Sequence, residues 1–369
     1  MTTRLFGDNS TRVDLPGVRA TLPAMSALTL EYHQGGLHLP GLGLWLDPQR
    51  AKAGHVFVSH AHCDHTAPHR EVILTEPTAW LMRHRLGGRR SERILRFGEP
   101  CELTGGHVPF RLTLLPAGHI LGSAMAFIEA GARSLLYTGD FKLRPNLCAE
   151  PCEPRHADYL VMETTFGRPQ YQFPPESGVW RDLLAFCRSA LNDGAMPVLF
   201  AYSLGKSQEL LAGLRDSGLG VALHKEAAKL TRIYEHFGRK FPSYEMFNGA
   251  NAHGKVLIAP PQASRSILFQ HLGKIRTAVV TGWAVDASCR FRSGTEAAFA
   301  LSDHADFPAL IEFVKRVSPK KVFTLHGFAA EFARTLRELG FDARALSEPE
   351  QLDLPLRVQS NHLAAWHEG

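Results

Sequence analysis

Short apolar runs separated by turn residues fill the first part of the chain. They are rich in β-branched and aromatic residues, a composition typical of buried β-strands. The pattern predicts a hairpin-rich start from Leu28 to Asp47, strands at 56–59, 71–75, 110–115, 124–128, 134–138 and 159–162, and a helix at 78–86.

Four of the predicted strands run directly into titratable side chains. These side chains are His60, His119, Asp140 and Glu163. Open α/β folds place their sites at the carboxyl edge of a sheet, where neighbouring strands end together. We therefore expect these four residues to lie close to one another.

The pattern changes after Phe166, where helical periodicity begins to alternate with short apolar strands. The predicted helices are 178–191, 206–214 and 225–237, and the predicted strands are 197–201, 255–259 and 278–281. This alternation is typical of a parallel α/β layer. After residue 297 the pattern of the first part of the chain returns, in which apolar segments end in titratable residues. It comprises the segment 298–306, a predicted helix at 308–317 and a predicted strand at 321–325 that ends at His326. We predict domain boundaries of 1–166 and 295–369 for an interrupted first domain, and 167–294 for an inserted second domain.

Composition narrows the function classes only modestly. The chain has 369 residues, 44% apolar and 21% charged, which is ordinary for a globular protein. The net charge of +5 is compatible with a polyanionic partner but does not require one. The six cysteines are scattered, and no signal peptide or membrane span is predicted, so we expect a cytoplasmic protein.

The segment His60-Ala61-His62-Cys63-Asp64-His65 is the strongest chemical signal in the chain. In an extended segment, side chains at i and i+2 share a face, so His60 and His62 can converge on one metal ion. Asp64 and His65 lie just beyond and can serve another ion. A structural zinc site would more often use cysteines, so the segment favours a two-metal site with open positions. The alternative is a solvated cluster of loop histidines.

Seven side chains form the predicted ligand set. His60, His62 and His119 would hold the first ion; Asp64, His65 and His326 would hold the second; Asp140 would bridge them. With a bridging hydroxide, two divalent ions and two carboxylates leave a net charge of about +1, which favours an anionic substrate such as a phosphodiester. Water bound to such ions ionises near neutral pH, at a pKa of roughly 7.

The leaving oxygen of a phosphodiester still needs a proton. His304 is our candidate general acid, and Glu163 could bond it and raise its pKa. A buried structural histidine is the alternative for His304. Lys206, in Gly205-Lys206-Ser207, is a candidate phosphate contact together with Ser302 and Ser123. A solvent-exposed lysine without a functional role is an equally good interpretation of Lys206.

These motifs resemble a known family. The run 60–65, Gly118-His119 with Gly122-Ser123, and Thr138-Gly139-Asp140 resemble the metallo-β-lactamase fold. Glu163 in Glu163-Thr164-Thr165-Phe166, His304 in Ser302-Asp303-His304, and His326 in Leu325-His326-Gly327 resemble three further motifs of its nucleic-acid-processing branch, the β-CASP nucleases. Within that branch, the resemblance is closest to the bacterial DNA-ligase-associated exonucleases, also described as predicted mRNA 3′-end processing factors.

The resemblance implies an α/β fold: a four-layer αββα core interrupted by a β-CASP α/β domain, with substrate between the two. It implies two zinc ions, with manganese as a substitute, and catalytic roles for Asp64, Glu163 and His304. The expected function is a nuclease that uses a hydroxide held by two zinc ions, and the resemblance implies a DNA exonuclease that works with a DNA ligase in repair. DNA is favoured over RNA as the nucleic-acid partner, and no membrane is expected.

Three alternatives remain at the level of sequence. The first is an endo- or exoribonuclease of the same branch. The second is a small-molecule hydrolase of thioesters or lactams. The inserted domain and His304 argue against this function, because a small ligand needs no second domain. The third is a non-catalytic nucleic-acid binder, which would require a damaged ligand set, whereas all seven ligands are present.

Overall fold

The computed structural model describes residues 30–33, 35–249, 253–270 and 272–346. The beginning of the predicted hairpin-rich segment, at residues 28 and 29, and the final segment 347–369 lie outside the described residues. No helix within the described part of the chain has the length and apolar character needed to cross a membrane.

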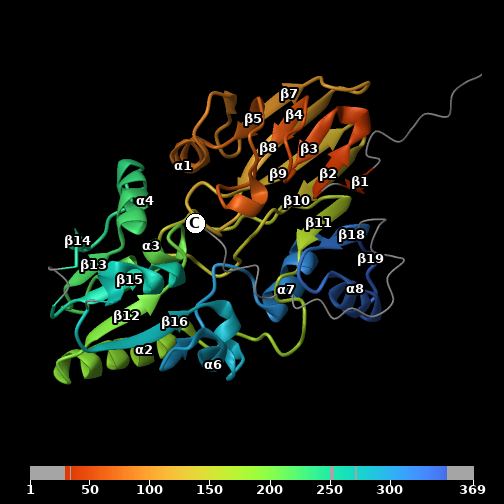
Figure 1. Ribbon diagram of the computed structural model, residues 1–369. Helices are drawn as coiled ribbons and strands as arrows, with labels where there is room; N and C mark the ends of the chain where they lie inside the picture. The colour runs from red at the N-terminus through yellow and green to blue at the C-terminus, as the bar shows by residue number, and fades with distance from the viewer. Residues whose placement is uncertain (1–29, 34, 250–252, 271, 347–369) are drawn as a thin grey trace, which may run out of the picture.

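Two β-sheets pack face to face and form the larger part of the molecule (Figure 1). The first sheet contains, in order, β1 (Glu31–His33), β2 (Gly36–Leu39), β3 (Leu44–Leu46), β4 (His55–Phe57), β5 (Glu71–Leu74) and β6 (Ser91–Ile94). The second contains, in order, β19 (Ala343–Ala345), β18 (Lys321–Leu325), β11 (Tyr159–Glu163), β10 (Arg133–Tyr137), β9 (Ala124–Ala130), β8 (Phe110–Pro116) and β7 (Pro100–Leu103). Leu44 and Phe57 of the first sheet share one apolar core with Leu112 and Tyr137 of the second.

Helices cover the outer face of each sheet and complete the predicted αββα layering. On the first sheet, α1 (Glu76–Leu86) packs Leu81 against Val56. On the second, α7 (Phe307–Val317) and α8 (Ala329–Glu338) pack Phe313 and Leu336 against Leu160. The fold class predicted from the sequence is therefore confirmed.

Local sequence explains where two of these helices begin. The Thr75 side chain accepts a hydrogen bond from the Thr78 amide, and a proline lies in the first turn of α1. Asp306 caps α7 in the same way through the Ala309 amide, and a proline follows in its first turn. These caps fix the strand-to-helix and loop-to-helix turns beside the carboxyl edges of the sheets.

A third, all-parallel sheet is inserted between two adjacent strands of the second sheet. β11 and β18 pair in parallel, yet the chain between them builds an entire layer of its own (Figure 1). This layer contains, in spatial order, β14 (Tyr244–Met246), β13 (Val221–Leu223), β15 (Val256–Ala259), β12 (Met196–Phe200), β16 (Ile275–Val280) and β17 (Ala297–Phe299). The accompanying helices are α2 (Glu176–Asn192), α3 (Lys206–Gly213), α4 (Lys225–His236), α5 (Ile267–Gln270) and α6 (Cys289–Ser293). We call this layer the inserted domain.

One predicted boundary differs from the structure. The sequence placed the end of the insertion at residue 294, but β17 pairs in parallel with β16 through Ala278↔Ala297 and the two pairs that follow. Those residues therefore belong to the third sheet, and the chain re-enters the core only after Phe299. Helices α5, α6 and α8 and the short strands β6, β7, β13, β14 and β19 had no counterpart in the sequence prediction.

Candidate metal centre

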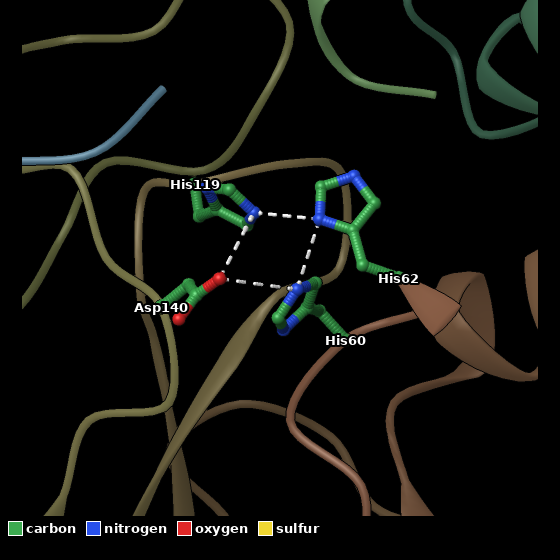
Figure 2. A group of neighbouring side chains, drawn as sticks. All are labelled: His60, His62, His119 and Asp140. Atoms are coloured by element: carbon green, nitrogen blue, oxygen red, sulfur yellow. Dashed lines mark hydrogen bonds and ion pairs between the residues drawn. The ribbon is translucent and has the colours of Figure 1, made fainter. Parts of the chain in front are cut away.

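Four predicted ligands converge at the carboxyl edge shared by the two core sheets. Figure 2 shows His60, His62, His119 and Asp140 turned toward a common point. His62 Nδ1 lies 3.0 Å from both His60 Nε2 and His119 Nε2. Asp140 Oδ2 lies 3.6 Å from His60 Nε2 and 3.9 Å from His119 Nε2. All four side chains are buried.

The outward-facing ring nitrogens explain why this cluster suits a cation. His119 Nδ1 donates to the Asp303 carbonyl at 2.8 Å, and His62 Nε2 donates to the Leu204 carbonyl at 3.3 Å. Those outer nitrogens act as donors, which leaves the inward His62 Nδ1 and His119 Nε2, 3.0 Å apart, as the atoms that would bind a cation. Burial and the neighbouring imidazoles lower the pKa of His119 to about 4 and that of His60 well below its ordinary value. Neutral imidazoles with oriented outer nitrogens are the form that binds zinc.

A second group of donors adjoins the first and shares Asp140 with it. His65 Nε2 lies 3.4 Å from Asp140 Oδ2 and 3.7 Å from Asp64 Oδ2, and the His326 ring lies 5.8 Å from the His65 ring. Burial alone would raise the pKa of Asp140, but the His65 imidazole and other neighbouring histidines hold it well below its usual range. The Asp64 side chain is 62% exposed, so this half of the site is open to the cavity. His326 has a left-handed backbone with φ of 59°, which is rare for a residue with a Cβ and is typical of functional sites.

Asp47 is an important site residue that the sequence prediction missed. Its carboxylate accepts hydrogen bonds from His65 Nδ1 at 2.9 Å, from the Ser59 hydroxyl at 2.5 Å and from the Tyr137 hydroxyl at 2.9 Å. Because Nδ1 of His65 is engaged, Nε2 is left facing Asp140. The available signal was the position of Asp47 directly after β3, which is hydrogen-bonded in parallel to the strand that leads to His60.

His304 and Glu163 form a bonded pair beside Asp140. His304 Nδ1 lies 2.9 Å from Glu163 Oε1, and His304 Nε2 lies 4.0 Å from Asp140 Oδ2. Glu163 is itself fixed by the backbone amides of Phe141 and Thr165. Burial lowers the pKa of His304, but the Glu163 and Asp140 carboxylates outweigh it and raise that pKa to about 10. The His304 ring is thus held in one orientation and keeps its proton readily.

The three predicted phosphate contacts have different surroundings. Ser302 lines the cavity, and its hydroxyl accepts a hydrogen bond from the His304 amide. The buried Ser123 hydroxyl instead accepts hydrogen bonds from the His119 and Ile120 amides, and so holds the His119 loop. The prediction for Lys206 is corrected: its side chain is 1% exposed and its Nζ bonds Glu209 at 2.7 Å, so the ammonium has an internal partner and no surface to offer a phosphate.

Buried ion pairs tie the inserted domain to the core below the site. Glu209 of α3 bonds Lys142 of the core at 2.7 Å as well as Lys206, and all three side chains are at most 2% exposed. Lys206 Nζ also lies 3.8 Å from Asp303 Oδ1. Asp303 Oδ2 is buried and has no hydrogen-bond partner among the described residues. Burial raises the pKa of Asp303, but Lys206 and the nearby histidines hold it far below its usual range, so a buried negative charge faces the cluster.

The site opens into a cavity of about 310 Å³ between the core and the inserted domain. Its lining combines Asp64, His65 and His326 from the second group of donors with His304 and with aromatic residues. Two of the predicted catalytic residues, Asp64 and His304, therefore share one accessible space with the predicted second-ion ligands, while Glu163 is buried against His304. The Leu204 carbonyl, which contacts His62, comes from the inserted domain, so both domains shape the centre.

Comparison with known proteins agrees with this architecture. Residues 297–346 match the family of the Zn-dependent metallo-hydrolase RNA specificity domain. The chain is 52% identical over 326 residues to a probable DNA ligase from Opitutus terrae, a match that covers 87% of the chain and 31% of that protein. It is 27% identical to the 5′ exonuclease Apollo of Gallus gallus, over 88% of the chain and 71% of the relative. A crystal structure of a protein of unknown function from Enterococcus faecalis V583 superposes with a TM-score of 0.54, at 16% identity, over 80% of this chain and 79% of the other.

The extent of these matches limits what each contributes. The chain spans about a third of the Opitutus protein, so that match concerns one region of a longer molecule. The Enterococcus structure is too distant in sequence to indicate more than a shared fold. Together, the matched segment at 297–346, the relatives named above, and the αββα core with its inserted domain show that the chain belongs to the β-CASP family of metallo-β-lactamase-fold nucleases.

Proposed function

We propose that this protein hydrolyses phosphodiester bonds in nucleic acids at a centre of two zinc ions, with manganese as a substitute, and that its substrate is the end of a DNA strand. The single observation that carries the proposal is the cavity in which a bonded His304–Glu163 pair stands beside Asp140, the carboxylate shared by both donor groups. A protonated imidazole and a cation-binding cluster in one space are the two components that phosphodiester hydrolysis needs.

The donor geometry supports the proposed ligand sets. His60, His62 and His119 would hold one ion, and Asp64, His65 and His326 the other, with Asp140 between them. When bound, such ions supply Lewis acidity and lower the pKa of water to about 7. The outer contacts of His62, His65 and His119 keep each ring in the orientation that binding requires.

The roles of the protein groups follow from their hydrogen bonds. Glu163 holds His304 through Nδ1, so Nε2 is the atom from which a proton would pass to the leaving oxygen. Because the pKa of His304 is about 10, the proton is present at neutral pH. Ser302 fixes the backbone at His304 through the amide of that residue and faces the cavity, where a phosphate oxygen could approach it.

DNA is favoured as the substrate by the similarity to a probable DNA ligase and to a 5′ exonuclease, and we propose that the protein prepares strand ends for ligation. RNA is the second candidate, because the matched family carries an RNA specificity description. The two substrates present the same phosphodiester to the site. Relative cleavage rates on DNA and RNA strands therefore distinguish the two.

The test is cleavage of end-labelled single- and double-stranded DNA and RNA by zinc- or manganese-loaded protein. We expect products with a 5′-phosphate and a 3′-hydroxyl, with DNA cleaved faster than RNA. His304→Ala should lower the rate by about 10²- to 10⁴-fold, the usual contribution of a general acid. His107→Ala, which removes an exposed histidine outside the cavity, is the matched control and should cleave normally. Absence of cleavage of every strand would refute the proposal, and a 3′-phosphate product would overturn the role of His304.

A further inference from the structure

A cluster of aromatic rings stands against the cavity on the side of His304. Trp283 lies 4.6 Å from Phe166 and 5.4 Å from Tyr171, measured between ring centroids, and 6.4 Å from Phe328. The Phe166 ring in turn lies 6.2 Å from the His304 ring. The Trp283 indole is therefore one ring away from the proposed general acid.

Within this cluster, Trp283 combines partial exposure with a place in the cavity lining, whereas Tyr171 is partly exposed but does not line the cavity. Phe166 and Phe328 are buried, at 2% and 9% exposure, so packing accounts for them fully. Trp283 is only partly buried and lines the same cavity as Asp64 and His326. Core packing alone does not require an indole to face a polar cavity at this point.

The backbone around Trp283 holds the indole in place. Trp283 is the second residue of the short helix η4 (Gly282–Val285), and its amide donates to the Thr281 hydroxyl at 3.4 Å. At Gly282, an added Cβ would lie 2.6 Å from the Phe166 ring and 2.8 Å from the Ser302 hydroxyl, so only glycine fits there. The turn that carries Trp283 is thus pressed directly against the residues that flank His304.

A fixed, partly exposed indole beside a phosphodiester site is well suited to bind a nucleobase. Every nucleobase presents a flat π-face, and stacking of a base on an aromatic side chain is tolerant of sequence. A cavity of about 310 Å³ has the size of a small-molecule pocket, which is large enough for a nucleotide. We propose that Trp283 is a stacking platform for an unpaired nucleobase next to the scissile phosphate, so that the site takes single-stranded nucleic acid. This inference rests on the proposed nuclease function.

Binding measurements test the platform without requiring turnover. The probes are a fluorescently labelled oligothymidylate and an abasic strand of equal length, both with phosphorothioate linkages that resist hydrolysis, each titrated with the zinc-loaded full chain and followed by fluorescence anisotropy. Trp283→Leu removes the ring but keeps apolar volume against Phe166, and Trp283→Phe restores a ring. Phe291→Leu is the matched control, because Phe291 is 72% exposed and does not line the cavity.

Stacking predicts a specific pattern of affinities. Wild type and Phe291→Leu should bind the oligothymidylate roughly 5- to 150-fold more tightly than the abasic strand. Trp283→Leu should lose most of that preference while binding the abasic strand as the wild type does, and Trp283→Phe should regain part of it. An equal preference in Trp283→Leu and wild type, or equal binding of both strands by wild type, overturns the proposal. Failure to cleave any strand refutes instead the nuclease function, and is read in the separate cleavage assay.

Discussion

Replacing Asp47 with asparagine should weaken metal binding without touching a predicted ligand. One carboxylate oxygen of Asp47 accepts hydrogen bonds from three donors: His65 Nδ1, the Ser59 hydroxyl and the Tyr137 hydroxyl. The other oxygen accepts from the Ser59 amide at 2.7 Å. An asparagine must place its NH₂ group against one of these two sets of donors, and in either orientation a buried donor faces another donor.

The size of the effect follows from the role of this carboxylate. Loss of an outer partner of a metal-binding histidine typically costs about 10- to 100-fold in metal affinity, or about 1.4 to 2.8 kcal/mol. Asp47 is 5% exposed, so solvent cannot replace the lost acceptor. We expect the effect at the ion held by His65, and a much smaller one at the ion held by His60, His62 and His119.

The assay is zinc binding measured in competition with a chromogenic chelator, which resolves two affinities. Tyr137→Phe is the matched control, because it removes one donor to Asp47 and leaves the bond to His65 intact. We expect Tyr137→Phe to bind zinc within about threefold of wild type. If Asp47→Asn binds both ions as tightly as wild type while remaining folded, the assignment of Asp47 as the residue that positions His65 is wrong.

Three further predictions concern stability, pH and metal. Glu209→Gln should lower the free energy of unfolding in urea by about 3–5 kcal/mol, because it removes the buried carboxylate that two buried lysines share, whereas Glu176→Gln, at a partly exposed partner of Lys142, should cost about 1 kcal/mol or less. Burial raises the pKa of Glu209 but its two lysines lower it further, so wild type should lose stability as pH falls below about 4.5 while Glu209→Gln does not; parallel curves would contradict this. Glu163→Gln should shift the alkaline limb of the kcat/KM profile to lower pH, because the acid form of His304 is lost as pH rises through a pKa that Glu163 raises. An unchanged alkaline limb would show that Glu163 does not raise the pKa of the catalytic acid. Zinc at about 100 times its Kd should add about 2.7 kcal/mol of stability for each ion bound, and the absence of any rise in Tm would contradict binding to the folded state.

The local sequence pattern was sufficient to predict the site residues that lie at the ends of strands. His60 and His62 stand at i and i+2 after a buried strand, and His119 and Asp140 follow strands of the second sheet, so periodicity and strand order were enough to predict their meeting. The His304–Glu163 contact spans 141 positions, yet was also predictable, because each residue follows or adjoins a recognisable motif.

Other parts of the site depend on packing that no local pattern specifies. The Leu204 carbonyl of the inserted domain accepts a hydrogen bond from His62. Every residue has a backbone carbonyl, so the residue type at position 204 could not predict this contact. Lys206 resembled a phosphate contact because helix N-termini often hold phosphates, but the buried Glu209 partner lies on the same helix and turns the ammonium inward. Trp283 lies in a turn whose position beside the cavity is set by Gly282 and Phe166, which only the folded chain brings together.

Stepwise addition of zinc to metal-free protein, with nuclease activity on single-stranded DNA measured at each step, tests the central claim most directly. The two donor groups joined by Asp140 predict that activity rises as the second equivalent binds and reaches its maximum at two zinc ions per chain. Full activity at one equivalent or fewer, or cleavage by the metal-free protein, would contradict a two-ion nuclease centre.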